Sequence, residues 1–129
     1  IEVSVEALAE AQADGRIRHI GLSNVTREQL DRAMRVAPIA SVQNRFNRAA
    51  PADGALVDYT AARGIAVVPY GPLGASPMKR GAKLDPLEAL AWLRERSPNI
   101  IAIPGTTSVQ HLEENAGVWR YMARLAAAA

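Results

Sequence analysis

The sequence predicts an α/β fold, a partial TIM barrel with about half the elements of a complete (β/α)8 barrel. Helical and strand-like patterns alternate along the chain, which is typical of a parallel sheet with right-handed crossovers. The strand patterns recur at intervals of roughly 22 to 35 residues, close to the repeat of a barrel. A complete barrel needs about 250 residues, whereas this chain has 129.

The first part of the chain predicts two helices, each followed by a strand. Apolar residues at helical spacing begin the chain, and Gly15 ends that helix, because glycine readily adopts the left-handed cap conformation. Thr26 and Gln29 form a capping box that starts the second helix, and Pro38 ends it. The two predicted strands are 16–22 and 39–42.

The second part of the chain repeats this order. A helix over 55–63 leads into 65–69, the clearest buried strand pattern in the sequence. A capping box over 85–88, with proline at the first helical position, starts the next helix. The strand 100–103 follows that helix, and a final helix comes after it.

The composition is that of a globular protein and excludes several kinds of site. Apolar residues make up 49% of the chain and charged residues 22%, which suffices for a core. The absence of cysteine excludes disulfides, thiolate metal sites and a cysteine nucleophile, and His19 and His111 are too few for a histidine-rich metal cluster. The net charge of +2 gives no reason to expect nucleic acid or a membrane as a partner.

The chain shows no targeting signal. No apolar run approaches the roughly 20 residues that span a bilayer, and no signal-peptide pattern opens the chain. We therefore expect a cytoplasmic protein. Because the chain begins with Ile1 inside a helical pattern, we also expect it to be part of a longer protein.

Polar and aromatic residues follow the predicted strands, where function collects in parallel α/β folds. The small polar groups among them can hold an amide or a hydroxyl, and the aromatic ring can stack on a planar ligand. The groups after the four strands are, in order, Ser23-Asn24, Gln43-Asn44, Tyr70-Gly71 and Pro104-Gly105-Thr106-Thr107.

The residues after the fourth strand predict a phosphate site. Thr107 or Ser108 caps the final helix, and a helix N-terminus offers unpaired N–H donors with a partial positive charge. Gly105 allows a ligand to approach the backbone, and Thr106 and Thr107 add hydroxyl groups. Together the strand ends indicate a nucleotide with an amide, a flat ring and phosphates, which fits a nicotinamide cofactor. No GxGxxG motif follows a strand, so the binding mode differs from the Rossmann one.

Four ordered segments of the sequence resemble the C-terminal half of an aldo-keto reductase. They are 15–24, 42–47, 68–74 and 103–115. The resemblance implies a (β/α)8 barrel in which residues 1–115 supply strands five to eight with their helices. Residues 116–129 form a divergent tail that matches nothing in the family, for which truncation and a non-native origin are both open.

The resemblance also implies that NADP (NADPH) binds in an extended form across these segments. The implied contacts are Ser23, Asn24 and Gln43 on the nicotinamide carboxamide; Tyr70 stacked on the nicotinamide ring; Gly71, Pro72 and Leu73 along the pyrophosphate; Gly105, Thr106, Thr107 and His111 around the adenosine 2′-phosphate; and Glu114 and Asn115 near the adenine.

By the same resemblance, the parent reaction is the reduction of aldehydes or ketones to alcohols by hydride transfer. The family's catalytic Asp, Tyr, Lys and His come from the first half of the barrel, and Tyr59, Tyr70 and Tyr121 match none of those positions. The chain is therefore expected to carry no catalytic residue and no metal ligand, and to be inactive alone. It would meet a small carbonyl substrate only together with the missing half.

The segment 75–83 is shorter than the loop that covers the cofactor in the family, which puts tight binding in question. Lys79, Arg80 and Lys83 within it are read most simply as solvated residues. The other hypothesis is that they supply positive charge near the phosphates.

Two other functions stay open. A half barrel leaves two unpaired strand edges and an apolar inner face, which must pair or aggregate. The chain is then a non-catalytic module, either a homodimer that rebuilds an eight-stranded barrel or a regulatory subunit of aldo-keto reductase type. A phosphosugar-binding half barrel keeps the phosphate site but leaves Ser23, Asn24, Gln43 and Tyr70 unexplained.

Overall fold

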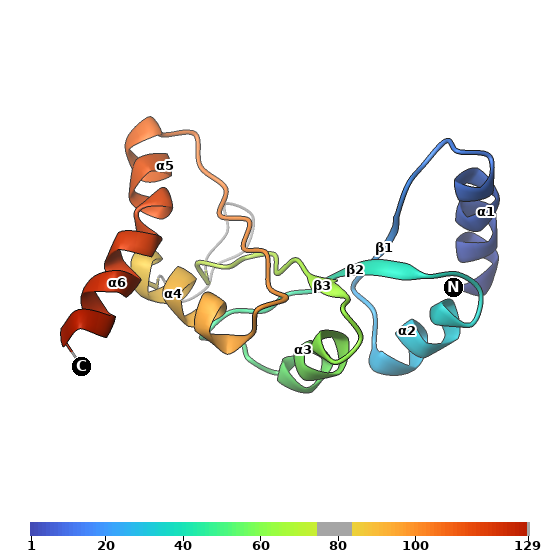
Figure 1. Ribbon diagram of the computed structural model, residues 1–129, viewed down its shortest axis with the longest axis horizontal. Helices are drawn as coiled ribbons and strands as arrows, with labels where there is room; N and C mark the ends of the chain where they lie inside the picture. The colour runs from blue at the N-terminus through green and yellow to red at the C-terminus, as the bar shows by residue number, and fades with distance from the viewer. Residues whose placement is uncertain (75–83, 129) are drawn as a thin grey trace.

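Helices and strands alternate in the computed structural model, which describes residues 1–74 and 84–128 (Figure 1). The strands β1 (Ile20–Ser23), β2 (Ile39–Gln43) and β3 (Ala66–Val67) form a parallel sheet in the order β1-β2-β3. The helices are α1 (Glu2–Ala13), α2 (Arg27–Met34), α3 (Gly54–Ala61), α4 (Pro86–Arg96), α5 (Val109–Ala116) and α6 (Val118–Ala128). They follow one another along an elongated, curved array, with α1 and α2 at one end and α4 to α6 at the other. The predicted α/β class is confirmed.

Local sequence signals fix the ends of several helices. The Thr26 hydroxyl accepts from the Gln29 backbone N–H at 3.2 Å, and the Gln29 side chain accepts from the Thr26 N–H at 2.8 Å, so this capping box is confirmed. Asp85 accepts from the Glu88 N–H at 2.9 Å and starts α4. Gly15, just after α1, has a φ of +73°, the left-handed conformation predicted for it.

The prediction of a strand over 100–103 is wrong. The segment lies beside β3 but does not form a strand. A single parallel bridge joins Ile100 to Val67, whose N–H and C=O bond to Asn99 and Ile101 at 2.9 and 2.8 Å. The N–H of Val68 faces the other way, to Val42 of β2 at 2.8 Å. The next backbone nitrogen turned toward 100–103 is therefore that of Pro69, which has no hydrogen to donate. The ladder stops there for lack of a donor.

The other predicted boundaries shift by a few residues. The strand predicted over 16–22 begins only at Ile20, because the N–H groups of Arg16 and Ile17 bond back to the Ala11 carbonyl at 2.9 and 3.3 Å and close α1. The strand predicted over 65–69 narrows to β3, and the helix predicted over 55–63 becomes α3.

Apolar residues join the helices to one face of the sheet. One buried cluster packs α1 and α2 against β1 and β2, and a second packs α3 and α4 against β3 and the 100–103 segment. Their central residues are Val5, Ile20, Leu30, Ala33, Ile39 and Val42 in the first, and Phe46, Val57, Val67, Leu93 and Ile100 in the second. Alternate residues of the strands, which point to the opposite face, include the exposed Gly21, Ser23 and Gln43.

Two ion pairs connect neighbouring helices at the surface. Arg32 of α2 donates two 2.6 Å hydrogen bonds to Glu2 of α1, and this contact lowers the pKa of Glu2 to about 2. Arg96 of α4 contacts Asp58 of α3 at 2.6 and 2.9 Å and lowers the pKa of that carboxyl. Each ion pair therefore joins two helices that are consecutive in the chain, α1 with α2 and α3 with α4.

The sequence predicts no element in the tail, but α6 lies there and packs on α4. Val118 is buried with Leu90 and Ala91, and Tyr121 and Met122 pack against the same cluster. Within the ranges that the structure describes, no helix combines the length and the apolar character needed to cross a membrane.

Candidate functional site

The carboxyl ends of the three strands bring Ser23, Asn24, Gln43 and Tyr70 together. Tyr70, which follows β3, donates its hydroxyl hydrogen to Asn24 Oδ1 at 2.8 Å. The side-chain nitrogen of Asn24 donates to the Ser23 hydroxyl at 3.2 Å, and that hydroxyl donates to the Gln43 carbonyl at 3.1 Å. We call these four residues the strand-end junction. Tyr70 is half-buried and the other three are exposed, so the junction faces solvent.

The backbone at Asn24 has an unusual conformation that fits its place in the junction. Its φ is +54°, in the left-handed region that asparagine tolerates better than most residues. Its N–H donates to the Gln43 carbonyl at 3.0 Å, which continues the pairing of β1 with β2 past the strand end. The loop after β1 is therefore fixed to β2 by both backbone and side chain.

Asn44, which the sequence analysis names after the second strand without assigning it a cofactor contact, is buried. Its side chain accepts from the Val25 N–H at 3.1 Å and donates to the Val25 carbonyl at 2.8 Å and to Asp53 at 2.9 Å. Asn44 thus fixes the backbone of the loop after β1 through Val25, from the buried side of that loop. The alternation of side chains along a strand could have indicated this role. It places Asn44 on the buried face, opposite Gln43, where an amide needs hydrogen-bond partners.

Asn47 is a second such residue, and it is completely buried. Its side-chain nitrogen donates to the Gly71 carbonyl at 2.8 Å, and its oxygen accepts from the Ala49 N–H at 2.9 Å. Gly71 has a φ of +64°, and its carbonyl also accepts from the Gly74 N–H at 3.0 Å. Asn47 therefore fixes the turn that follows Tyr70.

That turn leads from the junction to a pocket. Gly71, the buried Pro72 and Leu73 follow Tyr70 directly, and Leu73 lines the pocket. The pocket has a volume of about 500 Å³, within the range of small-molecule sites. Its lining residues are Leu73, Leu84, Pro86, Gly105, Thr106, His111, Glu114 and Asn115.

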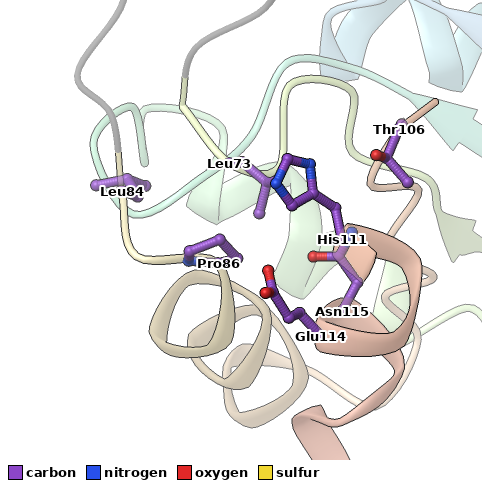
Figure 2. Close-up of a pocket in the computed structure, with 8 residues that line it drawn as sticks. Leu73, Leu84, Pro86, Thr106, His111, Glu114 and Asn115 are labelled. Carbon is purple, nitrogen blue, oxygen red and sulfur yellow. The ribbon is translucent and has the colours of Figure 1, made fainter. Parts of the chain in front are cut away.

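Side chains of α5 form one wall of this pocket. Figure 2 shows His111 pointing from α5 toward Leu73, and Glu114 pointing toward Pro86 at the start of α4. Among the lining residues, His111 is the one that can carry a positive charge and Glu114 the one that carries a negative charge. Asn115 is buried at the base of the wall.

The N-terminus of α5 differs in detail from the predicted phosphate site. Ser108 is the cap, and its hydroxyl accepts from the His111 N–H at 3.3 Å. The Ser108 N–H itself bonds to the Thr106 hydroxyl at 3.0 Å. Two N–H groups are thus already paired within the chain, and Thr107 is exposed outside the pocket lining. Lys79, Arg80 and Lys83, the other predicted source of positive charge, lie outside the residues that the structure describes.

Comparisons with known proteins agree on one family. Residues 1–88 match the model of the aldo/keto reductase family. The chain is 49% identical over 125 residues to pyridoxine 4-dehydrogenase of Escherichia coli, an alignment that covers 89% of this chain and 44% of that protein. It is 38% identical over 119 residues to the uncharacterized oxidoreductase C215.11c of Schizosaccharomyces pombe, covering 84% of this chain and 39% of that protein.

Solved structures of the family have the same fold. The chain superposes on aldose reductase from Giardia lamblia with a TM-score of 0.76 at 24% identity, covering 90% of this chain and 44% of that one. The chain spans less than half the length of these three relatives. The family match and the curated relatives show that the chain belongs to the aldo/keto reductase family of oxidoreductases.

Proposed function

We propose that residues 1–115 are the C-terminal half of an NADP-dependent aldo-keto reductase, with strands five to eight of the barrel, and that they bind NADPH across their strand ends. The observation that carries this proposal is the strand-end junction, in which Tyr70 is hydrogen-bonded to Asn24. In this proposal residues 116–129 are a divergent segment, whose helix α6 packs on α4.

The groups left free in the junction suit a nicotinamide carboxamide. The hydrogen bonds within the junction use one N–H of Asn24 and leave the other. The Gln43 side chain makes no hydrogen bond within the described part of the chain, so both its oxygen and its nitrogen are available to a ligand. A carboxamide offers one acceptor and two donors, which these groups complement. The half-buried Tyr70 ring next to them provides a face for a planar heterocycle.

The pocket beside α5 suits the adenosine end of the same ligand. It lies at the other end of the turn 71–73, which is the path that an extended dinucleotide would follow. The hydroxyl of Thr106 and the imidazole of His111 are its candidate partners for the 2′-phosphate, with Glu114 and Asn115 nearer the base. The Thr106 hydroxyl and the His111 imidazole favour NADP, because they can bind a 2′-phosphate. The negative charge of Glu114 works against it, because it repels a phosphate.

In this proposal the chain's residues would hold NADPH, which would supply a hydride for the carbonyl carbon of a small aldehyde or ketone. The chain's own residues bind the carboxamide, orient the ring and hold the phosphates. Two of the three tyrosines hydrogen-bond within the chain, since the Tyr70 hydroxyl bonds to Asn24 and Tyr59 bonds to Asp31 beneath the guanidinium of Arg63. The third, Tyr121, packs against the cluster between α4 and α6. In the family that the chain resembles, the catalytic Asp, Tyr, Lys and His lie in the first half of the barrel. In this proposal the proton for the alcohol oxygen therefore comes from that half, and the chain alone turns over no carbonyl.

Tyr70→Ala tests this proposal. Because the substitution removes the stacking face, we expect it to weaken NADPH binding at least about tenfold, as measured by the quenching of NADPH fluorescence. Trp119→Ala, which changes an aromatic residue 59% exposed on α6, is the matched control and should leave binding unchanged. Neither the parent chain nor the variants should oxidise NADPH with an aromatic aldehyde. Binding of a sugar phosphate without binding of either NADPH or NADH would contradict the proposal and favour a phosphosugar site.

A second candidate, a non-catalytic module that pairs with a second copy, is favoured by two exposed isoleucines. Ile101 and Ile103 are 56% and 41% exposed, on the face opposite the buried Ile100 and in a segment beside β3, the edge strand of the sheet. In sedimentation velocity, this candidate predicts a dimer that Ile101→Glu converts to a monomer, because a charge at the interface would have to be desolvated. A concentration-independent monomer with one cooperative melting transition excludes it.

A further inference from the structure

A second pocket lies between α4, α6 and the 100–104 segment, at the end of the array that α4, α5 and α6 occupy (Figure 1). It has a volume of about 270 Å³, just below the usual range for drug-sized ligands. Most of its lining residues are apolar, and one of them, Arg94, is charged. The lining residues are Leu90, Arg94, Ile100, Ile101, Ala102, Pro104, Asn115, Val118 and Trp119. This lining suits a small ligand that is mostly apolar.

The guanidinium of Arg94 is held in place but has no counter-charge. It extends from the last turn of α4, and its carbon lies 4.3 Å from the centre of the Trp119 ring. Its Nε is shielded from solvent without a hydrogen-bond partner, and no carboxylate in the described part of the chain pairs with the group. Arg96 in the same turn, by contrast, pairs with Asp58. A partly desolvated cation without an anion costs free energy, which a bound anion recovers.

Asn115 brings a second polar group without a partner to the same pocket. It is 7% exposed, and its side chain makes no hydrogen bond to another described residue. Buried amides normally have partners, because an unsatisfied amide is unfavourable. Asn115 also lines the pocket of the proposed cofactor site, whereas Arg94 and Trp119 do not. Arg94 and Trp119 therefore distinguish this second pocket from the cofactor site.

We propose that the pocket beside Arg94 binds a small monocarboxylate with an apolar chain. The terminal nitrogens of Arg94, which unlike Nε are not shielded, donate to the two carboxylate oxygens, because the planar guanidinium matches that group. The apolar chain lies against Leu90, Ile100 and Val118. A neutral apolar compound leaves Arg94 without a counter-charge, and an inorganic anion leaves the apolar walls in water. A monocarboxylate matches both parts of the pocket.

Hexanoate is the probe for this proposal, in a titration of the ¹⁵N-labelled chain followed by NMR. We expect a saturable shift of the Trp119 indole N–H, with a dissociation constant in the millimolar range that is usual for so small a ligand. Hexanamide has nearly the same shape without the charge. It should bind at least about tenfold more weakly, because hydrogen bonds between two charged groups are the stronger ones.

Arg94→Met makes the test specific to the guanidinium. Methionine keeps an apolar stem beside Trp119 and removes the charge. The variant should bind hexanoate at least about tenfold more weakly than the parent chain and should bind hexanamide as the parent does. Arg124→Met is the matched control, since it removes an exposed arginine of α6 outside the pocket, and both affinities should stay unchanged. If Arg94→Met does not fold, the comparison of hexanoate with hexanamide in the parent chain still decides.

Several outcomes overturn the proposal. They are the absence of a saturable shift at Trp119, equal affinities of the parent chain for hexanoate and hexanamide, and an equal loss in Arg94→Met and Arg124→Met. Shifts centred on His111 also overturn it, because the carboxylate then uses the pocket beside α5. So does a dimer that buries Trp119 in the absence of hexanoate, because the pocket is then an interface between two copies. The titration contains no NADPH, so a chain that binds hexanoate but no NADPH contradicts only the proposed function.

Discussion

Replacing Phe46 with alanine should lower the free energy of unfolding by about 3–5 kcal/mol, the usual cost of truncating a buried aromatic residue. Phe46 is 1% exposed and packs with Val57, Val67, Leu93 and Ile100. Its ring also contacts Trp92, with centroids 5.3 Å apart. The cluster joins α3 and α4 to β3 and to 100–103, a segment that a single bridge holds to the sheet. Because small domains have only about 5–15 kcal/mol of stability, the loss should leave little of the folded state.

Urea unfolding monitored by circular dichroism measures this change. Phe46→Leu should cost clearly less, because most of the buried volume is kept. Trp119→Ala serves as the control for losing an exposed aromatic ring and should change stability by less than about 1 kcal/mol. If Phe46→Ala costs no more than Trp119→Ala, the second cluster does not hold these elements together.

Features that depend on neighbouring residues could be predicted from the sequence. The capping box of Thr26 and Gln29 and the left-handed Gly15 involve residues within a few positions of each other, and both are confirmed. The alternation of helical and strand patterns can also be read directly along the sequence, and it predicted the α/β class and the parallel sheet. The prediction that strand ends share one edge requires only parallel topology, and Ser23, Asn24, Gln43 and Tyr70 do lie together.

Features that depend on the pairing of distant strands could not be predicted. The ladder beside 100–103 stops at Pro69 because of the register, which decides whether the missing N–H faces that segment or β2. The contact of Asn47 with Gly71 joins residues 24 positions apart in loops of irregular shape, and no local pattern indicates it. The cap of α5 is a local feature: the sequence left Thr107 and Ser108 both open, and the structure places Ser108 there, with its N–H bonded to the Thr106 hydroxyl.

Asn47→Asp should be the most damaging small substitution in the site, with a loss of about 3 kcal/mol near pH 8. The oxygen that accepts from Ala49 is kept, but the nitrogen 2.8 Å from the Gly71 carbonyl becomes a carboxylate oxygen. Two acceptors then face each other, and the residue at this position is completely buried. The turn at Gly71 should move away, and binding of 2′,5′-ADP in the neighbouring pocket should weaken.

The pH dependence of the stability loss in Asn47→Asp identifies its cause. Burial and the facing carbonyl raise the pKa of the introduced carboxyl in the folded state above its unfolded value of about 3.9. The folded state therefore binds a proton more tightly, and the protonated carboxyl can donate to Gly71. The stability difference from the parent should be small near pH 4 and should grow as the pH rises through the raised folded-state pKa. Urea unfolding of both proteins across this range measures the difference.

Asn99→Asp is the matched control for this prediction. The Asn99 nitrogen donates to the Ile65 carbonyl at 2.7 Å, so the same exchange places an acceptor against a carbonyl far from the turn at Gly71. It should also destabilise the fold, yet the molecules that remain folded should bind 2′,5′-ADP with the parent affinity. A loss in Asn47→Asp that stays constant with pH would mean that the Gly71 contact is not its source. A loss of binding in Asn99→Asp equal to that in Asn47→Asp would mean that the pocket responds only to overall stability and that Asn47 has no particular role in positioning the turn.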